Sequence, residues 1–331
     1  MNIGIWGTGA MGSLAAWRLA TALDRDSGKS NRLSVYGHYL PRVNHINQKG
    51  VTHVNLKGDR SNISVNATQQ CPHDCSIDVA LIFNKTYQLA RVGKELSQSL
   101  QKGALVLCFQ NGMGSATALK SANADANIIE GVLFEGVTID ASGDTIHRGY
   151  GQTWLGLTPA EEKRYSDILL LMRAVGFDLQ IQSDITSVQW SKLAANAAIN
   201  PLTALVGVQN KSIAEQPLLR SIASAAAEEV GRVADKLGVV RNKDYKDSML
   251  EVALNTGENT SSMLSDIQQN RDTEIEFING TIVNEGKRTG IPTPVNQMLL
   301  ALILNYSGTP MPLTTLELHW LQLNKHLHSR Q

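Results

Sequence analysis

The sequence predicts an α/β protein in which a domain built on a parallel sheet precedes an all-helical domain. Short β-branched segments alternate with helical segments in the first half, which is typical of parallel strands covered by helices. Strand signals fade after about Ser183, and alanine-rich helical patterns follow. A glycine-rich turn directly after the first strand supports the same division. We therefore predict one domain at residues 1–183 and a second at 184–331.

The first half contains strand patterns at residues 2–6, 33–36, 79–83 and 105–109, with helical patterns at 14–23 and 89–100. These strands are mostly apolar, as expected for a sheet buried on both faces. Further strands are expected at 128–132 and around Ile146 and Trp154. Frequent glycines in that region predict an antiparallel hairpin added to the edge of the sheet. In the second half, the predicted helices are 186–197, 218–237, 245–255, 262–289 and 293–306.

The composition excludes several classes of protein. The 331 residues carry 30 basic and 30 acidic side chains, so the basic excess expected of a nucleic-acid or membrane-surface protein is missing. No signal peptide is recognisable at Met1, and no apolar segment approaches the ~20 residues of a membrane span. Three cysteines do not suggest a disulfide framework. We expect a soluble cytoplasmic protein, either a monomer or a homodimer.

The segment Cys71-Pro72-His73-Asp74-Cys75 carries three potential metal ligands close together. No second ligand pair follows at the spacing of a zinc site. We therefore predict that the protein has no metal site.

The turn Gly7-Thr8-Gly9-Ala10-Met11-Gly12 predicts a dinucleotide-binding Rossmann-type domain. The Gly-x-Gly-x-x-Gly pattern is weak alone, but here it follows a strand and opens a helix. Gly7 permits the tight turn, Gly9 lets the backbone approach the pyrophosphate, and Gly12 allows the helix to pack closely on the strand. The alternative is a glycine turn that binds no ligand.

The end of the second strand favours NADPH over NADH. An Asp or Glu there would bind the ribose 2′-hydroxyl of NAD, but the segment after Tyr36 contains none. His38 and Arg42 are instead candidates for contact with a 2′-phosphate. A solvated loop charge remains an alternative interpretation of Arg42.

Two polar patterns in the second half are candidate substrate sites. Lys192, Asn196 and Asn200 are spaced by four, so they share one face of an otherwise apolar helix that Pro201 is expected to end or bend. Buried polar groups need partners, and a polar substrate would provide them. Ser262, Asp266, Asn270 and Glu274 form a second repeat of four after a serine N-cap. Solvent-facing stripes are the alternative in both cases, and for the first pattern so are asparagines that bond to backbone between helices.

Taken together, these patterns resemble the ketopantoate reductase (2-dehydropantoate 2-reductase) family over nearly the whole length of the chain. The resemblance rests on the glycine turn, Asn84-Lys85-Thr86, Gln110-Asn111-Gly112-Met113-Gly114, Lys192-Leu193-Ala194-Ala195-Asn196 with Asn200-Pro201-Leu202-Thr203, and Ser261-Ser262-Met263-Leu264-x-Asp266 with Thr273-Glu274-Ile275-Glu276-Phe277-Ile278-Asn279-Gly280. It implies a Rossmann domain followed by a helical domain, with a cleft between them. It also implies reduction of ketopantoate to pantoate in pantothenate and coenzyme A biosynthesis.

The resemblance further implies a role for each candidate residue. Lys192 is the general acid and Glu274 a substrate-orienting carboxylate. Asn196 and Asn200 bind the hydroxyl or carbonyl oxygen of the substrate, and Ser262 binds its carboxylate. Lys85 and Asn111 lie between cofactor and substrate, and Asp266 supports the site.

The proposed chemistry suits these residue types. Hydride delivery to a ketone carbon builds negative charge on oxygen, and a lysine ammonium stabilises that charge and then donates a proton. Leu133-Phe134-Glu135 replaces the small polar residues common in the family, which suggests added bulk and charge near a different 2-keto acid. A paralogous 2-keto acid reductase is therefore one alternative, and a non-catalytic NADP(H) sensor is another, although a sensor needs neither Lys192 nor Glu274.

Overall fold

A computed structural model describes residues 1–25, 31–72, 75–123 and 125–328. Within these ranges the chain forms two compact units. The first comprises residues 1–110 and 114–185, and the second comprises 111–113 and 186–331. The short segment 111–113 therefore belongs with the helical unit, although it follows a strand of the first unit.

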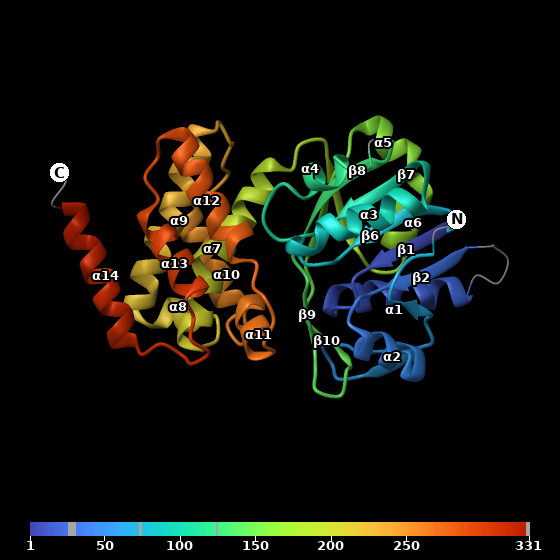
Figure 1. The fold of residues 1–331 in the computed structure, drawn as a ribbon, viewed down its shortest axis with the longest axis horizontal. Coiled ribbons are helices and arrows are strands. Elements are labelled where there is room, and N and C mark those ends of the chain that lie inside the picture. The colour runs from blue at the N-terminus through green and yellow to red at the C-terminus, as the bar shows by residue number, and fades with distance from the viewer. Residues whose placement is uncertain (26–30, 73–74, 124, 329–331) are drawn as a thin grey trace. The chain divides into compact units, whose positions relative to one another are not determined.

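The first unit is built on an eight-stranded sheet in the order β12-β11-β8-β7-β6-β1-β2-β5. Strands β5, β2, β1, β6, β7 and β8 run parallel, whereas β11 is antiparallel to β8. Strands β1, β2, β6, β7 and β8 of this sheet are labelled in Figure 1. The strands are β1 (Asn2–Trp6), β2 (Arg32–Tyr36), β5 (Ala67–Thr68), β6 (Ile77–Ile82), β7 (Leu100–Cys108), β8 (Asn127–Leu133), β11 (Gln152–Gly156) and β12 (Asp178–Gln182).

Alternating side chains of these strands enter two cores, one on each face of the sheet. Ile3 and Ile5 of β1 join the core that includes α1 (Ala10–Arg25), α2 (Leu40–Lys49) and α6 (Ser166–Ala174). Trp6 of the same strand points into the core with α3 (Leu89–Ser99) and α4 (Ser115–Lys120). A parallel sheet covered by helices on both faces confirms the predicted fold class of this unit.

The predicted edge hairpin is only partly confirmed: the strand around Trp154, β11, joins the main sheet antiparallel to β8, but the strand around Ile146 lies elsewhere. The hairpin forms between β9 (Gly136–Ile139) and β10 (Thr145–Gly149), but it belongs to a separate four-stranded sheet with β3 (Val51–Val54) and β4 (Arg60–Ile63). This small sheet packs on α1, where the rings of Trp17 and His53 lie 4.2 Å apart. Local turn signals predict a hairpin, but they do not say which strand it will join. Two short helical segments, η1 (Thr86–Gln88) and α5 (Pro159–Arg164), complete this unit.

The second unit is all-helical, as predicted (Figure 1). Its helices are α7 (Thr186–Val206), α8 (Ser212–Glu215), α9 (Pro217–Lys236), α10 (Tyr245–Asn255), α11 (Ser262–Gln268), α12 (Ile275–Thr289), α13 (Pro294–Leu304) and α14 (Leu313–His328). A continuous apolar core with many alanines joins them. Within the described ranges, no helix combines the length and apolar character that crossing a membrane requires.

Two expectations about these helices are wrong. The helix predicted at residues 186–197 is longer, since α7 continues to Val206 with Pro201 inside it, so the proline does not end the helix. The helix expected at residues 262–289 is two helices, since Asn270 adopts a positive φ of 51° between α11 and α12. Asparagine tolerates this left-handed conformation, which ends an α-helix. The repeat from Ser262 to Glu274 therefore does not form a single helical face.

Candidate functional site

The glycine turn lies where the strand order of the main sheet reverses. From β1 the chain passes to β2 on one side, and β6 then pairs on the other side of β1. Ligands of open α/β sheets bind at such a switch point, outside the carboxyl ends of the strands. The backbone of Phe83 donates to the carbonyl of Trp6 at 2.7 Å, so the segment after β6 runs beside the glycine turn.

Each glycine of the turn has the local geometry that a dinucleotide requires. Gly7 has φ of +115°, and an added Cβ would lie 2.8 Å from the backbone of Phe83. An added Cβ at Gly12 would overlap the carbonyl oxygen of Gly7, so the start of α1 packs directly on the turn. At Gly9 an added Cβ would meet no atom within 4 Å. The backbone of Gly9 is thus open to an approaching phosphate next to the N-terminus of α1, whose first turn has no acidic residue.

The segment Asn84-Lys85-Thr86 follows β6 at the same end of the sheet. Asn84 and Gln110 hold this segment in place, because Gln110 donates to the carbonyls of Ile82 at 2.8 Å and Asn84 at 3.2 Å. The Asn84 amide donates to Gln88 at 2.9 Å. Lys85 directly precedes η1, in extended conformation. Gln110 was not assigned a role from the sequence, since only the fold brings it against β6.

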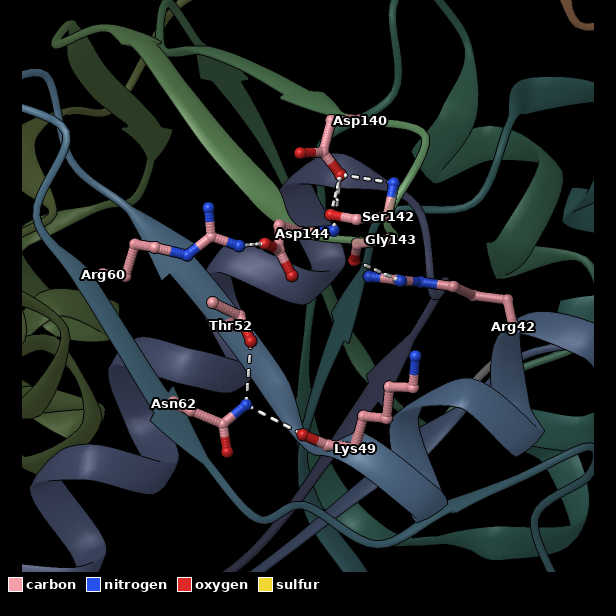
Figure 2. A network of polar contacts seen from close by, with 9 residues as sticks. All are labelled: Arg42, Lys49, Thr52, Arg60, Asn62, Asp140, Ser142, Gly143 and Asp144. Atoms are coloured by element: carbon pink, nitrogen blue, oxygen red, sulfur yellow. Dashed lines mark hydrogen bonds and ion pairs between the residues drawn. The ribbon is translucent and has the colours of Figure 1, made fainter.

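Arg42 at the start of α2 bonds to the glycine turn and to the β9–β10 turn. It donates from Nε to the carbonyl of Thr8 at 3.2 Å, from Nη2 to Oγ of Ser13 at 2.9 Å, and from Nη1 to the carbonyl of Gly143 at 2.6 Å. Figure 2 shows the last of these bonds, beside the turn that Asp140 closes by accepting from Ser142. Among the described residues, Arg42 bonds only to neutral oxygens. Its positive charge is therefore held beside the glycine turn, where burial lowers the pKa of the guanidinium and the negative charge of Asp140 opposes part of this shift.

His38 is placed less favourably for a phosphate than the sequence suggests. Its Nε2 lies 3.7 Å from Oε1 of Glu95, a residue of α3. The other carboxylate oxygen of Glu95 accepts from Nε1 of Trp6 at 3.1 Å. Burial raises the pKa of Glu95. The end of β2 thus has a neighbouring carboxylate after all, contributed by a helix some 60 residues later in the chain.

Glu135 does not add an unbalanced charge near the end of β8. It accepts two hydrogen bonds from Arg18 of α1, at 2.5 and 2.9 Å, and the side chains of the pair are only 3% and 5% exposed. His147 lies 3.6 Å from the same carboxylate. The expectation that Glu135 brings charge toward the substrate is therefore wrong, and only Phe134 stays exposed at this strand end.

In the helical unit, α7 carries Lys192, Asn196 and Asn200 on successive turns. Desolvation lowers the pKa of Lys192 from its ordinary 10.5 to about 8, and the negative charge of Glu274 opposes part of this shift. Glu274 is 4% exposed and directly precedes α12. An amine with a pKa near neutrality is poised for proton transfer, a property that is common at active sites.

Segment 111–113 contributes to the surroundings of Glu274. Nδ2 of Asn111 donates to Oε2 of Glu274 at 3.4 Å. Gly112 has φ of +88°, and an added Cβ there would lie 2.3 Å from the carbonyl oxygen of Phe277 on α12, so the backbone itself lies against this helix. The structure therefore brings together three sequence-predicted residues, Lys192, Glu274 and Asn111.

Asn200 and Ser262 also meet, at the start of α11. Nδ2 of Asn200 lies 3.5 Å from Oγ of Ser262, which is exposed at the first position of the helix. The N-cap is Ser261, whose hydroxyl accepts from the backbone of Leu264 at 3.2 Å and from Thr203 of α7 at 2.7 Å. Ser261 and Thr203 thus hold Ser262 against α7, a function that the sequence did not assign to them.

Asp266 is not part of the same surface as Ser262. It is 1% exposed and pairs with Arg271, with Nη2 and Oδ1 2.8 Å apart. This ion pair bridges the break between α11 and α12. Asp266 therefore fixes the segment that leads to Glu274, which agrees with a supporting role.

No metal cluster is present among the described residues: no group of three His, Cys, Asp or Glu side chains has a suitable arrangement. Burial raises the pKa of the Cys71 thiol to about 11, which disfavours the thiolate that metals bind. His73, the middle candidate of that segment, lies outside the described residues.

Comparison with known proteins identifies the family. Residues 3–160 match the family described as ketopantoate reductase PanE/ApbA, and residues 184–307 match its C-terminal model. The chain belongs to the ketopantoate reductase family. It is therefore an oxidoreductase that binds a nicotinamide dinucleotide.

Several relatives span almost the whole chain. The 2-dehydropantoate 2-reductase of Pyrococcus abyssi is 32% identical over 304 residues, covering 92% of this chain and 97% of its own. The structure of 2-dehydropantoate 2-reductase from Geobacter metallireducens GS-15 has a TM-score of 0.81 at 26% identity, covering 93% of this chain and all of that one. A D-mandelate dehydrogenase solved with NADH and anilino(oxo)acetate has a TM-score of 0.80, with 92% and 97% coverage, and at 22% identity it shows only a shared fold.

The glycine geometry predicts opposite outcomes for two small substitutions. Gly9→Ala should fold with a melting temperature within about 2 °C of the wild type, since its methyl group meets no protein atom, yet weaken dinucleotide binding at least about tenfold by blocking the phosphate. Gly12→Ala should lose about 1–3 kcal/mol of unfolding free energy through overlap with Gly7. Thermal melting and fluorescence titration with NADPH measure both effects. Normal dinucleotide affinity in Gly9→Ala contradicts the assignment of this loop.

Proposed function

We propose that the protein catalyses the NADPH-dependent reduction of 2-dehydropantoate to pantoate, a step of pantothenate and coenzyme A biosynthesis. The observation that carries the proposal is Lys192, a lysine with a pKa of about 8 within the electrostatic reach of Glu274, on a helix that also presents two asparagines. The substrate class follows from the relatives named 2-dehydropantoate 2-reductase, at about 30% identity.

The side chains of α7 suit the reduction of a ketone. When bound, the nicotinamide supplies the hydride to the carbonyl carbon. Lys192 stabilises the charge that grows on the carbonyl oxygen and donates its proton there. Asn196 and Asn200 hold the carbonyl and hydroxyl oxygens, and Ser262 binds the carboxylate of the substrate. Glu274 orients the substrate and keeps Lys192 protonated, because its charge raises the pKa of the lysine.

The cofactor site is proposed to consist of the glycine turn from Gly7 to Gly12, with Lys85 and Asn111 toward the nicotinamide and Arg42 and His38 toward the 2′-phosphate. The geometry of this turn fits a pyrophosphate, because the open space at Gly9 lets the phosphate approach the backbone. Arg42 supports NADPH because hydrogen bonds to neutral oxygens hold its charge beside the turn, although the charge of Asp140 also acts on it. Glu95 beside His38 is the feature that would instead favour a ribose hydroxyl.

A paralogous reductase acting on another 2-keto acid is the second candidate function. The observation that favours it is Phe134, a large side chain exposed immediately after β8 where small polar residues are common in the family. A larger apolar wall suits a bulkier 2-keto acid.

Oxidation of NADPH by purified protein with ketopantoate, against a panel of branched and aromatic 2-keto acids, tests both functions. Ketopantoate should give the highest kcat/KM, and Lys192→Ala should lower it about 10²–10⁴-fold because the proton donor is lost. The control is Lys211→Ala, which removes a half-buried lysine that precedes α8 and pairs with Glu258. Preference for another keto acid supports the paralogue, and unchanged turnover in Lys192→Ala rules out the mechanism.

The pH dependence of kcat/KM should report the state of Lys192. The protonated lysine is the active form, so activity should stay constant below its pKa and fall as the pH rises through about 8. Glu274→Gln removes a negative charge that raises this pKa, so the falling limb should move to lower pH. Steady-state rates from pH 6 to 10 measure both profiles. A falling limb that does not move in Glu274→Gln argues against the coupling.

Arg42→Ala tests the cofactor preference. Loss of a charge-assisted contact to the 2′-phosphate should raise the KM for NADPH by about 10- to 100-fold while changing the KM for NADH about twofold or less. Ser13→Ala is the matched control, since it removes one acceptor of Arg42 but keeps the charge. An equal rise for both cofactors would mean that Arg42 only fixes the glycine turn.

A further inference from the structure

Helix α7 contains a proline within the segment that carries the proposed substrate ligands. Pro201 has no N–H, so the carbonyl of Ala197, four residues earlier, has no donor within the helix. The helix nevertheless continues to Val206, and this part of it is buried. A buried carbonyl without a partner is costly, so another group must bond to Ala197.

Asn279 of α12 supplies the missing donor. Its Nδ2 lies 2.9 Å from the carbonyl oxygen of Ala197 and 3.0 Å from Oδ1 of Asn296, and the side chain is fully buried. Both neighbours accept hydrogen bonds, so the amide must present its nitrogen to them. The side chain thus replaces the N–H that Pro201 lacks with a bond that joins two helices.

The partner of Asn279 is itself fixed by a buried acid. Asn296 donates to Oε2 of Glu229 at 2.8 Å and to the carbonyl of Ala226 at 3.1 Å, both on α9. Glu229 also accepts from the backbone of Val295 at 2.8 Å and of Asn296 at 2.9 Å, at the start of α13. These groups are at most 2% exposed, apart from Val295 at 3%. Asn279 is therefore held by a buried hydrogen-bond network rather than by packing alone.

The position of this bond matters for the proposed site. Ala197 lies directly after Asn196, and Pro201 directly after Asn200, so Asn279 bonds to the turn of α7 that carries both amides. Asn279 is also five residues after Glu274, on the helix that Glu274 precedes. This hydrogen bond thus links α7, which carries Lys192 and the two asparagines, to α12, which directly follows Glu274. An alanine at position 201 would offer its N–H to the carbonyl of Ala197 within α7, so that this carbonyl would no longer depend on Asn279 for a donor.

We propose that Asn279 is a positioning residue for the reduction: by bonding to the carbonyl that Pro201 leaves unpaired, it sets α7 relative to Glu274. This inference rests on the proposed function. Asn279 acts through Lys192 and the two asparagines and does not touch the substrate. Small displacements of catalytic groups cost up to about 100-fold in rate, which gives the scale of the expected effect.

A cycle of Asn279→Leu, Pro201→Ala and the double variant tests the proposal. Asn279→Leu should lower both the melting temperature and kcat, the latter about 10- to 100-fold, with the Kd for NADPH unchanged. Pro201→Ala should leave kcat within about threefold of the wild type, because the bond from Asn279 can remain. In the double variant, the alanine N–H should restore much of the melting temperature while kcat stays low.

The double variant separates positioning from stability. A purely structural role predicts that kcat recovers together with the melting temperature, and this outcome overturns the proposal. The control is Asn210→Leu, since Asn210 is a buried amide of the same unit that donates to Thr256 at 2.9 Å. It should lower the melting temperature without lowering kcat. If Asn279→Leu alone does not fold, the comparison of the double variant with Pro201→Ala gives the same answer.

A second readout does not depend on turnover. The midpoint of the Lys192 titration, followed by NMR of the lysine side chains, should move in the Asn279→Leu and double variants but not in Asn210→Leu, because only the first two change the relation of Lys192 to Glu274. If the wild type reduces no 2-keto acid, the proposed function fails, and this titration alone decides the role of Asn279. An unchanged midpoint in both variants refutes it.

Discussion

The helical unit is organised around one constraint, a lysine ammonium held in a largely apolar helix. Burial of Lys192 disfavours its charge and lowers its pKa to about 8, and Glu274 limits that shift. The surrounding polar groups fix the position of each partner. Asn111 bonds to Glu274, Arg271 pairs with Asp266 on the segment that leads to it, and Ser261 with Thr203 fixes α11 against α7. A poised amine therefore depends on several polar contacts between the elements around it.

The Rossmann unit meets a different requirement, which is to expose backbone N–H groups to an anion. It does so by leaving space rather than by adding side chains. A Cβ added at Gly9 would meet no atom within 4 Å, whereas the lack of a Cβ at Gly7 and Gly12 lets α1 pack close to the strand. Arg42 then ties this turn to the β9–β10 turn. One turn of the small second sheet thus fixes the arginine beside the glycines.

Buried polar pairs in this protein join elements rather than merely filling space. Arg18 and Glu135 connect α1 to the end of β8, and Glu229, Asn296 and Asn279 connect four helices of the second unit. Such groups are expensive to bury, and their main effect is to specify one arrangement of the elements. In α7, Pro201 leaves the carbonyl of Ala197 without a donor from its own helix, and Asn279 of the neighbouring α12 donates to that carbonyl instead.

Sequence by itself determined the features that depend on local pattern: the parallel sheet from apolar runs, the phosphate turn from three glycines, and the shared helical face of Lys192, Asn196 and Asn200 from their spacing. Only the tertiary structure decided which distant groups meet. The repeat from Ser262 to Glu274 is interrupted at Asn270, where the helix ends. His38 lies near a carboxylate of α3, and Glu135 pairs with Arg18. Asn279 donates to the carbonyl of Ala197. The physical reason is that periodicity reports which face of an element is buried, whereas the partner of a buried polar group depends on the packing of elements far apart in the chain.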